Sequence, residues 1–400
     1  MPHWTDGLEG VLHPTTPDAF IRHHWEDAPL VLEGRGREIF DGLLSLDELD
    51  QILTTTGLRY PTFRLIKQGK ALPTQSYTVG PIEWGTGAVD AFINYENVRS
   101  LMRDGATLVL EAIQRSYEPL AELSRLFEKH LSCPAPINLY CTPPNAQGLL
   151  PHFDVQNVFV LQLHGSKHWK VYEPHMNRPL RNHANFGAVE PGELLHDVTL
   201  RPGDLLYMPR GFVHCAQTTD ELSVHVSVSM IPYSWADVFR ELINRLPEDV
   251  RFREAVPLQP AGPADCDEGL EARFTQLMTV LAEDSDLEDT LDAMGLRFVA
   301  TRLPDTRGQL VALEPTDAIT LASTLETKPG IIWRVEADTN HAHLHFHGKT
   351  TSFPWHALAT VRWIANASRF TVGDIPGDLD DDTRCSLAQH LIDEGFLQRI

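Results

Sequence analysis

Apolar runs and period-two alternation dominate the chain up to residue 234, after an N-terminal part that mixes helices and strands. Residues 157–164 are rich in apolar side chains and predict a buried strand, and Gly165-Ser166 predicts a tight turn into a returning strand at 167–172. Residues 222–230 alternate strictly between apolar and polar side chains. Their polar face carries Ser223, His225, Ser227 and Ser229. This face could line a wet pocket, but alternation alone favours the solvent face of an antiparallel sheet.

The pattern changes to a helical one at residue 235. Apolar residues recur at three- and four-residue intervals in 235–246 and 270–281, on either side of a proline-rich connection at 255–264. From residue 304 we expect short strands and two helices, at 355–365 and 380–399, the second with an acidic first turn. The chain is therefore predicted to be an α+β protein with domains at 1–234, 235–303 and 304–400.

Three polar residues of the strand-rich part form a candidate metal site. His152 and Asp154 are two residues apart, so on an extended strand both side chains leave the same face. His214 follows a Pro-Gly turn, a short apolar strand and a bend that contains Pro209 and Gly211. Two imidazoles and one carboxylate suit a divalent first-row metal, leave about three octahedral positions open, and indicate iron(II) oxygenase chemistry. The alternative is three unrelated polar residues at strand ends.

Further polar residues lie on strand faces that could meet this site. Lys167 shares its face with Trp169 and Val171, which should point into a barrel. A buried ammonium requires an anion, and a dicarboxylate co-substrate would supply one. Alternation alone leaves it equally open that Lys167 reaches water beside the turn. Asn138 and Tyr140 share one side of a strand just before the metal motif. They are either groups of the pocket or hydrogen-bonded polar residues of the core.

Composition narrows the class of protein. The chain has no run of eighteen apolar residues, so no membrane span is predicted. Its first residues show no basic stretch followed by an apolar core, which is the pattern of a signal peptide. Five scattered cysteines fit a reducing cytosol, so we expect a cytoplasmic protein. The net charge of −22 disfavours direct DNA binding, and it either attracts a basic protein partner or only keeps the chain soluble.

The segments 136–154 and 158–172 resemble the JmjC-type ribosomal oxygenases, which are cupin-fold protein hydroxylases dependent on iron(II) and 2-oxoglutarate. The similarity is dense from about residue 136 to 230, and the order of regions matches across nearly the whole chain. The resemblance implies that 1–234 is a double-stranded β-helix (jelly-roll) catalytic domain, 235–303 a helical dimerisation region, and 304–400 a winged-helix-like domain that does not read DNA. A homodimer is therefore expected.

The resemblance also implies roles for individual residues. His152, Asp154 and His214 would bind iron(II), and Lys167 would pair with the far carboxylate of 2-oxoglutarate, which the enzyme consumes together with O2. Asn138 and Tyr140 match positions near the co-substrate and the metal, and His225 and Ser229 match the wall of the substrate pocket. The expected substrate is a histidine or arginine side chain of a ribosomal protein, which is a basic partner.

Two matters stay open on the sequence. An oxygenase acting on a small molecule or another protein, or a non-catalytic cupin-like binding protein, would carry the same fold. The stretch His341-Ala-His-Leu-His-Phe-His347 is not part of the family's chemistry. Its alternating histidines could hold a metal with partners from elsewhere, but a two-faced strand with Ala342, Leu344 and Phe346 packed inward and its histidines in solvent is favoured.

Overall fold

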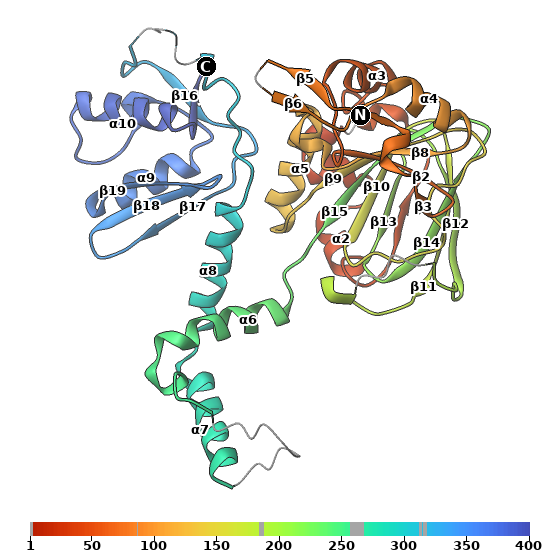
Figure 1. Cartoon of the computed structure of the whole chain (residues 1–400). Helices are drawn as coiled ribbons and strands as arrows, with labels where there is room; N and C mark the ends of the chain where they lie inside the picture. The colour runs from red at the N-terminus through yellow and green to blue at the C-terminus, as the bar shows by residue number, and fades with distance from the viewer. Residues whose placement is uncertain (1–2, 86, 184–187, 257–267, 312–313, 315–317) are drawn as a thin grey trace. The chain divides into compact units, whose positions relative to one another are not determined.

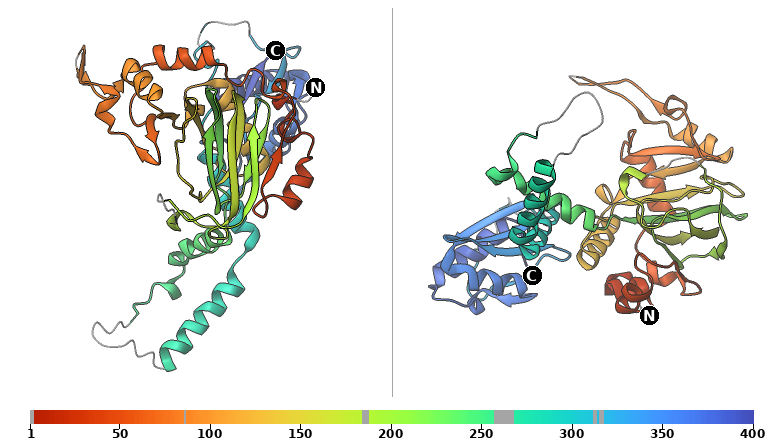
Figure 2. Two further views of the ribbon diagram at one scale, coloured as in Figure 1. Left: turned by 90° about the vertical axis from the view of Figure 1, so that its right-hand side faces the viewer. Right: turned by 90° about the horizontal axis from the view of Figure 1, so that it is seen from below.

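The computed structural model describes residues 3–85, 87–183, 188–256, 268–311, 314 and 318–400. It divides into two compact units, 1–232 and 233–400, which are described separately. Figure 1 shows the course of the chain and Figure 2 gives two further views. No helix in the described part of the chain is long and apolar enough to cross a membrane.

The first unit is built on two antiparallel sheets. The larger has eight strands in the order β1-β13-β10-β15-β9-β8-β2-β3, and the smaller has the order β12-β11-β14. The larger sheet consists of β1 (Leu30–Leu32), β2 (Phe63–Lys67), β3 (Lys70–Ala71), β8 (Thr107–Leu110), β9 (Ile137–Thr142), β10 (Asn157–His164), β13 (Leu205–Met208) and β15 (Ser223–Met230). The smaller consists of β11 (Lys167–Pro174), β12 (Leu194–Leu200) and β14 (Phe212–Thr218). The predicted strand, turn and returning strand are confirmed as β10, Gly165-Ser166 and β11.

Helices cover the outer face of the larger sheet. They are α1 (Leu8–Leu12), α2 (Pro17–His23), α3 (Leu46–Thr55), α4 (Tyr95–Arg103) and α5 (Glu118–Leu131), and two small ribbons, β4 (Thr78–Val79) with β7 (Phe92–Ile93) and β5 (Ile82–Trp84) with β6 (Gly87–Val89), accompany them. Phe20 of α2 and Phe127 of α5 both pack against Phe159 of β10, and all three side chains are fully buried. Apolar side chains on the inner faces form a second, smaller cluster that includes Val160, Trp169 and Leu206. The space between the two sheets is therefore partly filled by side chains.

One expectation from the alternating strand is wrong. Val224, Val226 and Val228 of β15 belong to the core beneath the helices, so the polar face of this strand points into the barrel and not into solvent. His225 is 2% exposed and Ser227 is 8% exposed. The solvent prediction failed because alternation says that a strand has one apolar face but not which face the helices cover.

The second unit begins with the helices α6 (Trp235–Arg245), α7 (Glu268–Asp284) and α8 (Leu287–Ala300). The helices expected at 235–246 and 270–281 are confirmed, whereas most of the proline-rich connection lies outside the described residues. Two three-stranded sheets follow, β17-β18-β19 and β20-β16-β21, together with the helices α9 (Leu358–Asn366) and α10 (Asp381–Asp393). Their strands are β16 (Thr324–Thr327), β17 (Trp333–Ala337), β18 (His341–Phe346), β19 (Lys349–Pro354), β20 (Arg369–Thr371) and β21 (Leu397–Arg399).

The last helix is shorter than its pattern predicts. A helix over 380–399 was expected, but α10 ends at Asp393, and Gly395 takes a positive φ of 82° that turns the chain into β21. The helix expected at 355–365 is confirmed, with a short 3-10 turn at Trp355–Ala357 before α9. The division at residues 303 and 304 stays a prediction.

Candidate metal centre and cavity

A backbone bridge brings the two candidate histidines together. The N–H of His152 donates to the carbonyl of His214 at 3.1 Å, and the N–H of His214 donates back to the carbonyl of His152 at 2.8 Å. The Gly211 N–H donates to the carbonyl of Asp154 at 2.8 Å, which fastens the bend before β14 to the same segment. Gly211 has a φ of +93°, and a Cβ there would lie 1.9 Å from the carbonyl oxygen of Met176, so only glycine fits this bend.

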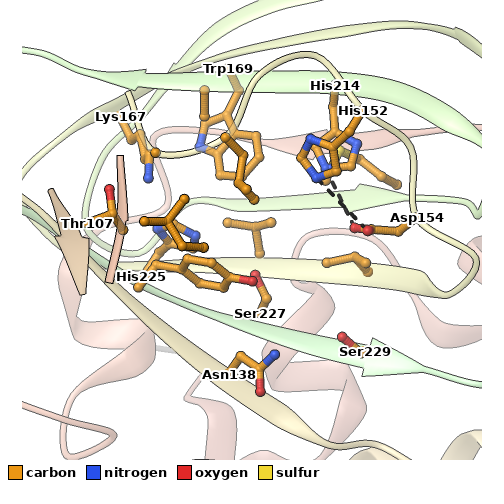
Figure 3. Close-up of a pocket in the computed structure, with 18 of the residues that line it drawn as sticks. Thr107, Asn138, His152, Asp154, Lys167, Trp169, His214, His225, Ser227 and Ser229 are labelled. Atoms are coloured by element: carbon orange, nitrogen blue, oxygen red, sulfur yellow. Dashed lines mark ion pairs between the residues drawn. The ribbon is translucent and has the colours of Figure 1, made fainter. Parts of the chain in front are cut away.

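The ligand atoms of His152, Asp154 and His214 converge (Figure 3). His152 Nε2 lies 4.0 Å from Asp154 Oδ1, and His214 Nε2 lies 3.7 Å from Asp154 Oδ2. All three ligand atoms fall within 4.8 Å of one another, which no other group of three such residues does among the described part of the chain. The predicted triangle of side chains is therefore present.

Both imidazoles are oriented as metal ligands. Nδ1 of His152 lies 2.8 Å from the carbonyl of Leu150, and Nδ1 of His214 lies 3.1 Å from the carbonyl of Phe212. A carbonyl oxygen can only accept, so each Nδ1 carries its proton and donates it, which leaves the Nε2 lone pairs toward Asp154. Burial, with the nearby His152, lowers the pKa of His214 to about 4 and keeps that ring neutral. Two imidazoles and one carboxylate fit a divalent first-row metal with open positions.

The candidate centre opens into a cavity of about 310 Å³ between the sheets. This volume lies at the lower end of the range for small-molecule sites. Lys167 projects into the cavity and is 5% exposed, so the alternative that it reaches water is wrong. Its Nζ donates to the Thr142 hydroxyl at 3.1 Å, and Thr107 donates to that same hydroxyl at 3.2 Å. Burial lowers the pKa of Lys167 to about 7. No carboxylate lines the cavity among the described residues except Asp154, so Lys167 lacks the anion that a buried ammonium requires.

The other expected residues also line this cavity. Asn138, Tyr140, His225 and Ser229 contribute to its wall from β9 and β15, as Figure 3 shows for three of them. Asn138 is fixed by the Ala112 N–H, which donates to its Oδ1 at 2.9 Å. The rings of Tyr140 and His225 stack at 4.9 Å, and burial lowers the pKa of His225 and raises that of Tyr140.

Two buried polar atoms of the cavity have no hydrogen-bond partner among the described residues. They are Nε1 of Trp169 and Nδ1 of His225. Buried polar groups in native proteins are nearly always satisfied by protein, water or ligand. Together with the buried amine of Lys167, they make the inner end of the cavity suited to a polar, anionic small molecule.

Sequence reasoning missed three polar residues of the cavity wall, namely Arg64, Thr107 and Gln156. The alternation rule could have found one of them. Gln156 follows His152 and Asp154 at the same two-residue spacing. Thr107 carried no such signal, because it reaches the cavity through the pairing of β8 with β9.

The two sheets form a barrel of the cupin type, and this barrel holds a centre of two histidines and one carboxylate. Comparison with known proteins identifies the family to which such a domain belongs. Residues 111–238 match the family model of the JmjC domain. A protein named ribosomal oxygenase 1 from Gallus gallus is 31% identical over 314 residues, which cover 74% of this chain and 50% of that protein. A bifunctional lysine-specific demethylase and histidyl-hydroxylase NO66 from Aedes aegypti is 30% identical over 315 residues, covering 74% and 48%.

The solved structure of the Escherichia coli ribosomal oxygenase YcfD in complex with cobalt and 2-oxoglutarate has the same fold. Its TM-score is 0.57 at 20% identity, covering 96% of this chain and 98% of that one. This chain therefore carries a JmjC domain and is a relative of the ribosomal oxygenases. It spans about half the length of the curated relatives it matches.

The ligand geometry predicts how metal affinity responds to Asp154→Asn. The amide keeps the shape of the carboxylate but removes the only negative charge of the three ligands. Affinity should fall by more than the roughly 10–100-fold typical of losing an outer-shell partner. Manganese(II) binding, followed through the loss of the free-ion EPR signal, measures it. Asp197→Asn is the matched control, because Asp197 pairs with His168 and Lys170 away from the cavity. Equal affinities for both variants would contradict the assignment.

Proposed function

We propose that this protein is an iron(II)- and 2-oxoglutarate-dependent oxygenase that hydroxylates a side chain of a ribosomal protein. The observation that carries the proposal is a cavity in which a two-histidine, one-carboxylate centre and a buried lysine face the same space. Two similar proteins, a ribosomal oxygenase and a histidyl-hydroxylase, support hydroxylation as the class of reaction. The neighbour solved with cobalt and 2-oxoglutarate supports the co-substrate.

His152, Asp154 and His214 would hold the iron(II), which when bound supplies the activation of O2 that no side chain can provide. The Nδ1 hydrogen bonds to Leu150 and Phe212 fix both rings so that the Nε2 atoms stay directed at the ion. Val158, Val160 and Trp169 form an apolar part of the cavity wall and keep the site poor in water.

Lys167 would bind the far carboxylate of 2-oxoglutarate, with the Thr142 hydroxyl beside it. In the ligand-free protein near pH 8 this amine is largely neutral, because burial lowers its pKa to about 7. A carboxylate placed against the amine favours its charged form, so binding of the co-substrate raises the pKa again and takes up a proton. The lysine thus recognises a dianion without carrying an unpaired charge between turnovers.

Of the two substrate side chains expected from the resemblance, the cavity favours histidine. Among the described lining residues the only carboxylate is Asp154, which is a candidate metal ligand. Arg64 also lines the cavity, and the nearby Glu111 is already its ion-pair partner. A guanidinium would find no free anion and a like charge nearby, whereas a neutral imidazole could hydrogen-bond to Asn138 and Ser229.

The second unit carries the remaining expectations. We infer that it mediates homodimerisation, because Trp235, Phe239 and Ile243 lie four residues apart on α6 and are 67%, 58% and 56% exposed. The opposite side of this helix is covered, since Val238 and Glu241 are buried and Glu241 pairs with Arg297 of α8 at 2.6 Å. Large apolar side chains exposed together on one face are typical of an interface.

We further propose that residues 304–400 form a winged-helix-like domain without a DNA-binding role. The net charge of −22 supports this expectation, because DNA binding normally needs a basic surface. The expected location is the cytoplasm. The same acidic charge would attract a basic ribosomal protein.

Replacing Lys167 should weaken 2-oxoglutarate binding and abolish its proton uptake. Lys167→Met is expected to lower affinity by roughly a hundredfold, since the loss of one partner of a buried charge pair costs about 2–5 kcal/mol. Calorimetry at pH 8 in two buffers of different ionisation enthalpy gives both affinity and proton uptake. The uptake should shrink at pH 6, where the free amine is already protonated. Lys170→Met, on the outer side of the same strand, is the control. Unchanged affinity in Lys167→Met would refute the role.

The reaction and its substrate are tested together on ribosomal proteins. Mass spectrometry of ribosomal proteins from cells with and without the gene should show one histidine that gains the mass of an oxygen atom only when the protein is present. Synthetic peptides with histidine, arginine or alanine at that position should be hydroxylated only with histidine, with stoichiometric conversion of 2-oxoglutarate to succinate. Hydroxylation of the arginine peptide would contradict the substrate choice, and the absence of any turnover would contradict the function.

The dimer inference predicts a change of mass in solution. Phe239→Asp places a charge in the exposed stripe and should convert the dimer to a monomer in light scattering coupled to size-exclusion chromatography. Asn244→Asp, an exposed change on the same helix, should leave the dimer intact. A wild-type monomer, or a dimer unaffected by Phe239→Asp, would rule this interface out.

A further inference from the structure

The hairpin of β17 and β18 gathers histidines and a carboxylate on one surface of the second unit. Ala342, Leu344 and Phe346 of β18 are buried in the core of this unit, as the two-faced pattern predicted. His341, His343 and His345 therefore lie together on the opposite face, with ring centroids 5.9 and 6.0 Å apart. His347 is not part of this row, because it is buried beyond the end of the strand.

The turn between the two strands supplies the carboxylate that the sequence pattern lacked. Asp338 follows β17, and its Oδ2 lies 3.1 Å from Nε2 of His343. Its Oδ1 lies 3.8 Å from Nδ1 of His341. Metal–nitrogen and metal–oxygen bonds of about 2.0–2.2 Å place two ligand atoms of one zinc ion roughly 3–3.5 Å apart. The Asp338–His343 pair already has this spacing.

Asp338 and His343 are held in place by neighbours that do not compete for the metal. Asp338 Oδ1 accepts the backbone N–H groups of Asn340 and His341, each at 2.7 Å, and these hydrogen bonds lower the pKa of the carboxyl. Nδ1 of His343 lies 2.9 Å from the Ser352 hydroxyl, which steadies the ring with Nε2 toward Asp338. Two of the three ligands are thus prepared before any ion arrives.

His341 completes the set and His345 does not. His341 is more than half exposed, and its ring can rotate to bring a nitrogen closer to the Asp338–His343 pair. His345 pairs in register with Arg334 of β17, whose cation disfavours a metal there, and its Nδ1 contacts the Thr350 hydroxyl at 3.0 Å. The chemistry of the donors, two imidazoles and one carboxylate, suits zinc(II) and similar borderline ions.

We propose that Asp338, His341 and His343 form a second metal site, selective for zinc-type divalent ions and separate from the candidate iron centre. In this site Asp338 and His343 are the prearranged ligands, and His341 closes on the ion as it binds. Water fills the remaining coordination position. The site does not depend on the oxygenase proposal, because it uses none of the residues of the cavity.

Zinc stoichiometry tests the proposal without an activity assay. His152→Ala/Asp154→Ala removes the candidate iron centre, so this variant should still bind one zinc ion per chain in competition with a chromophoric chelator. The wild type should bind two. Adding Asp338→Asn to the double variant should weaken the remaining zinc by roughly tenfold or more, since the loss of even an outer-shell partner of a metal costs about 10–100-fold in affinity. The asparagine can keep the hydrogen bonds to Asn340 and His341, so the turn should persist.

Two further variants separate a defined site from a loose array of histidines. His343→Gln should remove one of the two zinc ions from the wild type and the remaining zinc ion from the double variant. Circular dichroism checks that each variant is folded. His345→Gln, a change on the same strand and face, should leave stoichiometry and affinity unchanged. The proposal is overturned if the double variant binds no zinc, or if His345→Gln weakens zinc as much as His343→Gln does.

Discussion

The pair of backbone hydrogen bonds between His152 and His214 is the constraint on which the candidate centre depends. The two residues are sixty-two positions apart in the chain, and their rings approach to 4.4 Å between centroids because the segments that carry them form a single antiparallel bridge. The bridge fixes the backbone of both histidines. The Gly211 N–H then fastens Asp154 to the bend on the other side. Because His214 belongs to β14, these hydrogen bonds tie the backbone of all three candidate ligands to the edge of the smaller sheet.

The backbone of the strands also positions the other residues of the cavity. β15 directs valines to the helices and directs His225, Ser227 and Ser229 to the cavity, so one strand serves the core and the site together. β11 directs Lys167 and Trp169 to the cavity, and its other face, which carries Lys170, is partly exposed. A register slip of one residue would exchange the two faces and destroy both. Packing of the large apolar core beneath the helices therefore also keeps the polar residues of the cavity aligned.

The sequence predicted the candidate metal ligands well because their signal is local. A two-residue spacing on a strand and a glycine bend before His214 are visible without knowledge of the fold. The burial of Lys167 and the inward face of β15 were less predictable, since each depends on which side the helices cover. Thr107 and Arg64 reach the cavity only through the pairing of β2, β8 and β9. No local pattern of residues in the sequence predicts this pairing. The end of the last helix at Asp393 depended on the conformation of Gly395.

The two clusters of histidines in this chain differ in what holds them together. At the candidate iron centre, the ligands come from distant segments, His214 is buried, and both rings are oriented by backbone carbonyls. On the β17–β18 hairpin, strand alternation places His341 and His343 side by side, and the adjoining turn supplies Asp338. Exposed ligands lose their hydration at little cost but also gain little from a low dielectric. A centre that opens into a cavity and keeps free coordination positions suits catalysis, whereas one on the outer face of a single hairpin suits reversible binding of an ion.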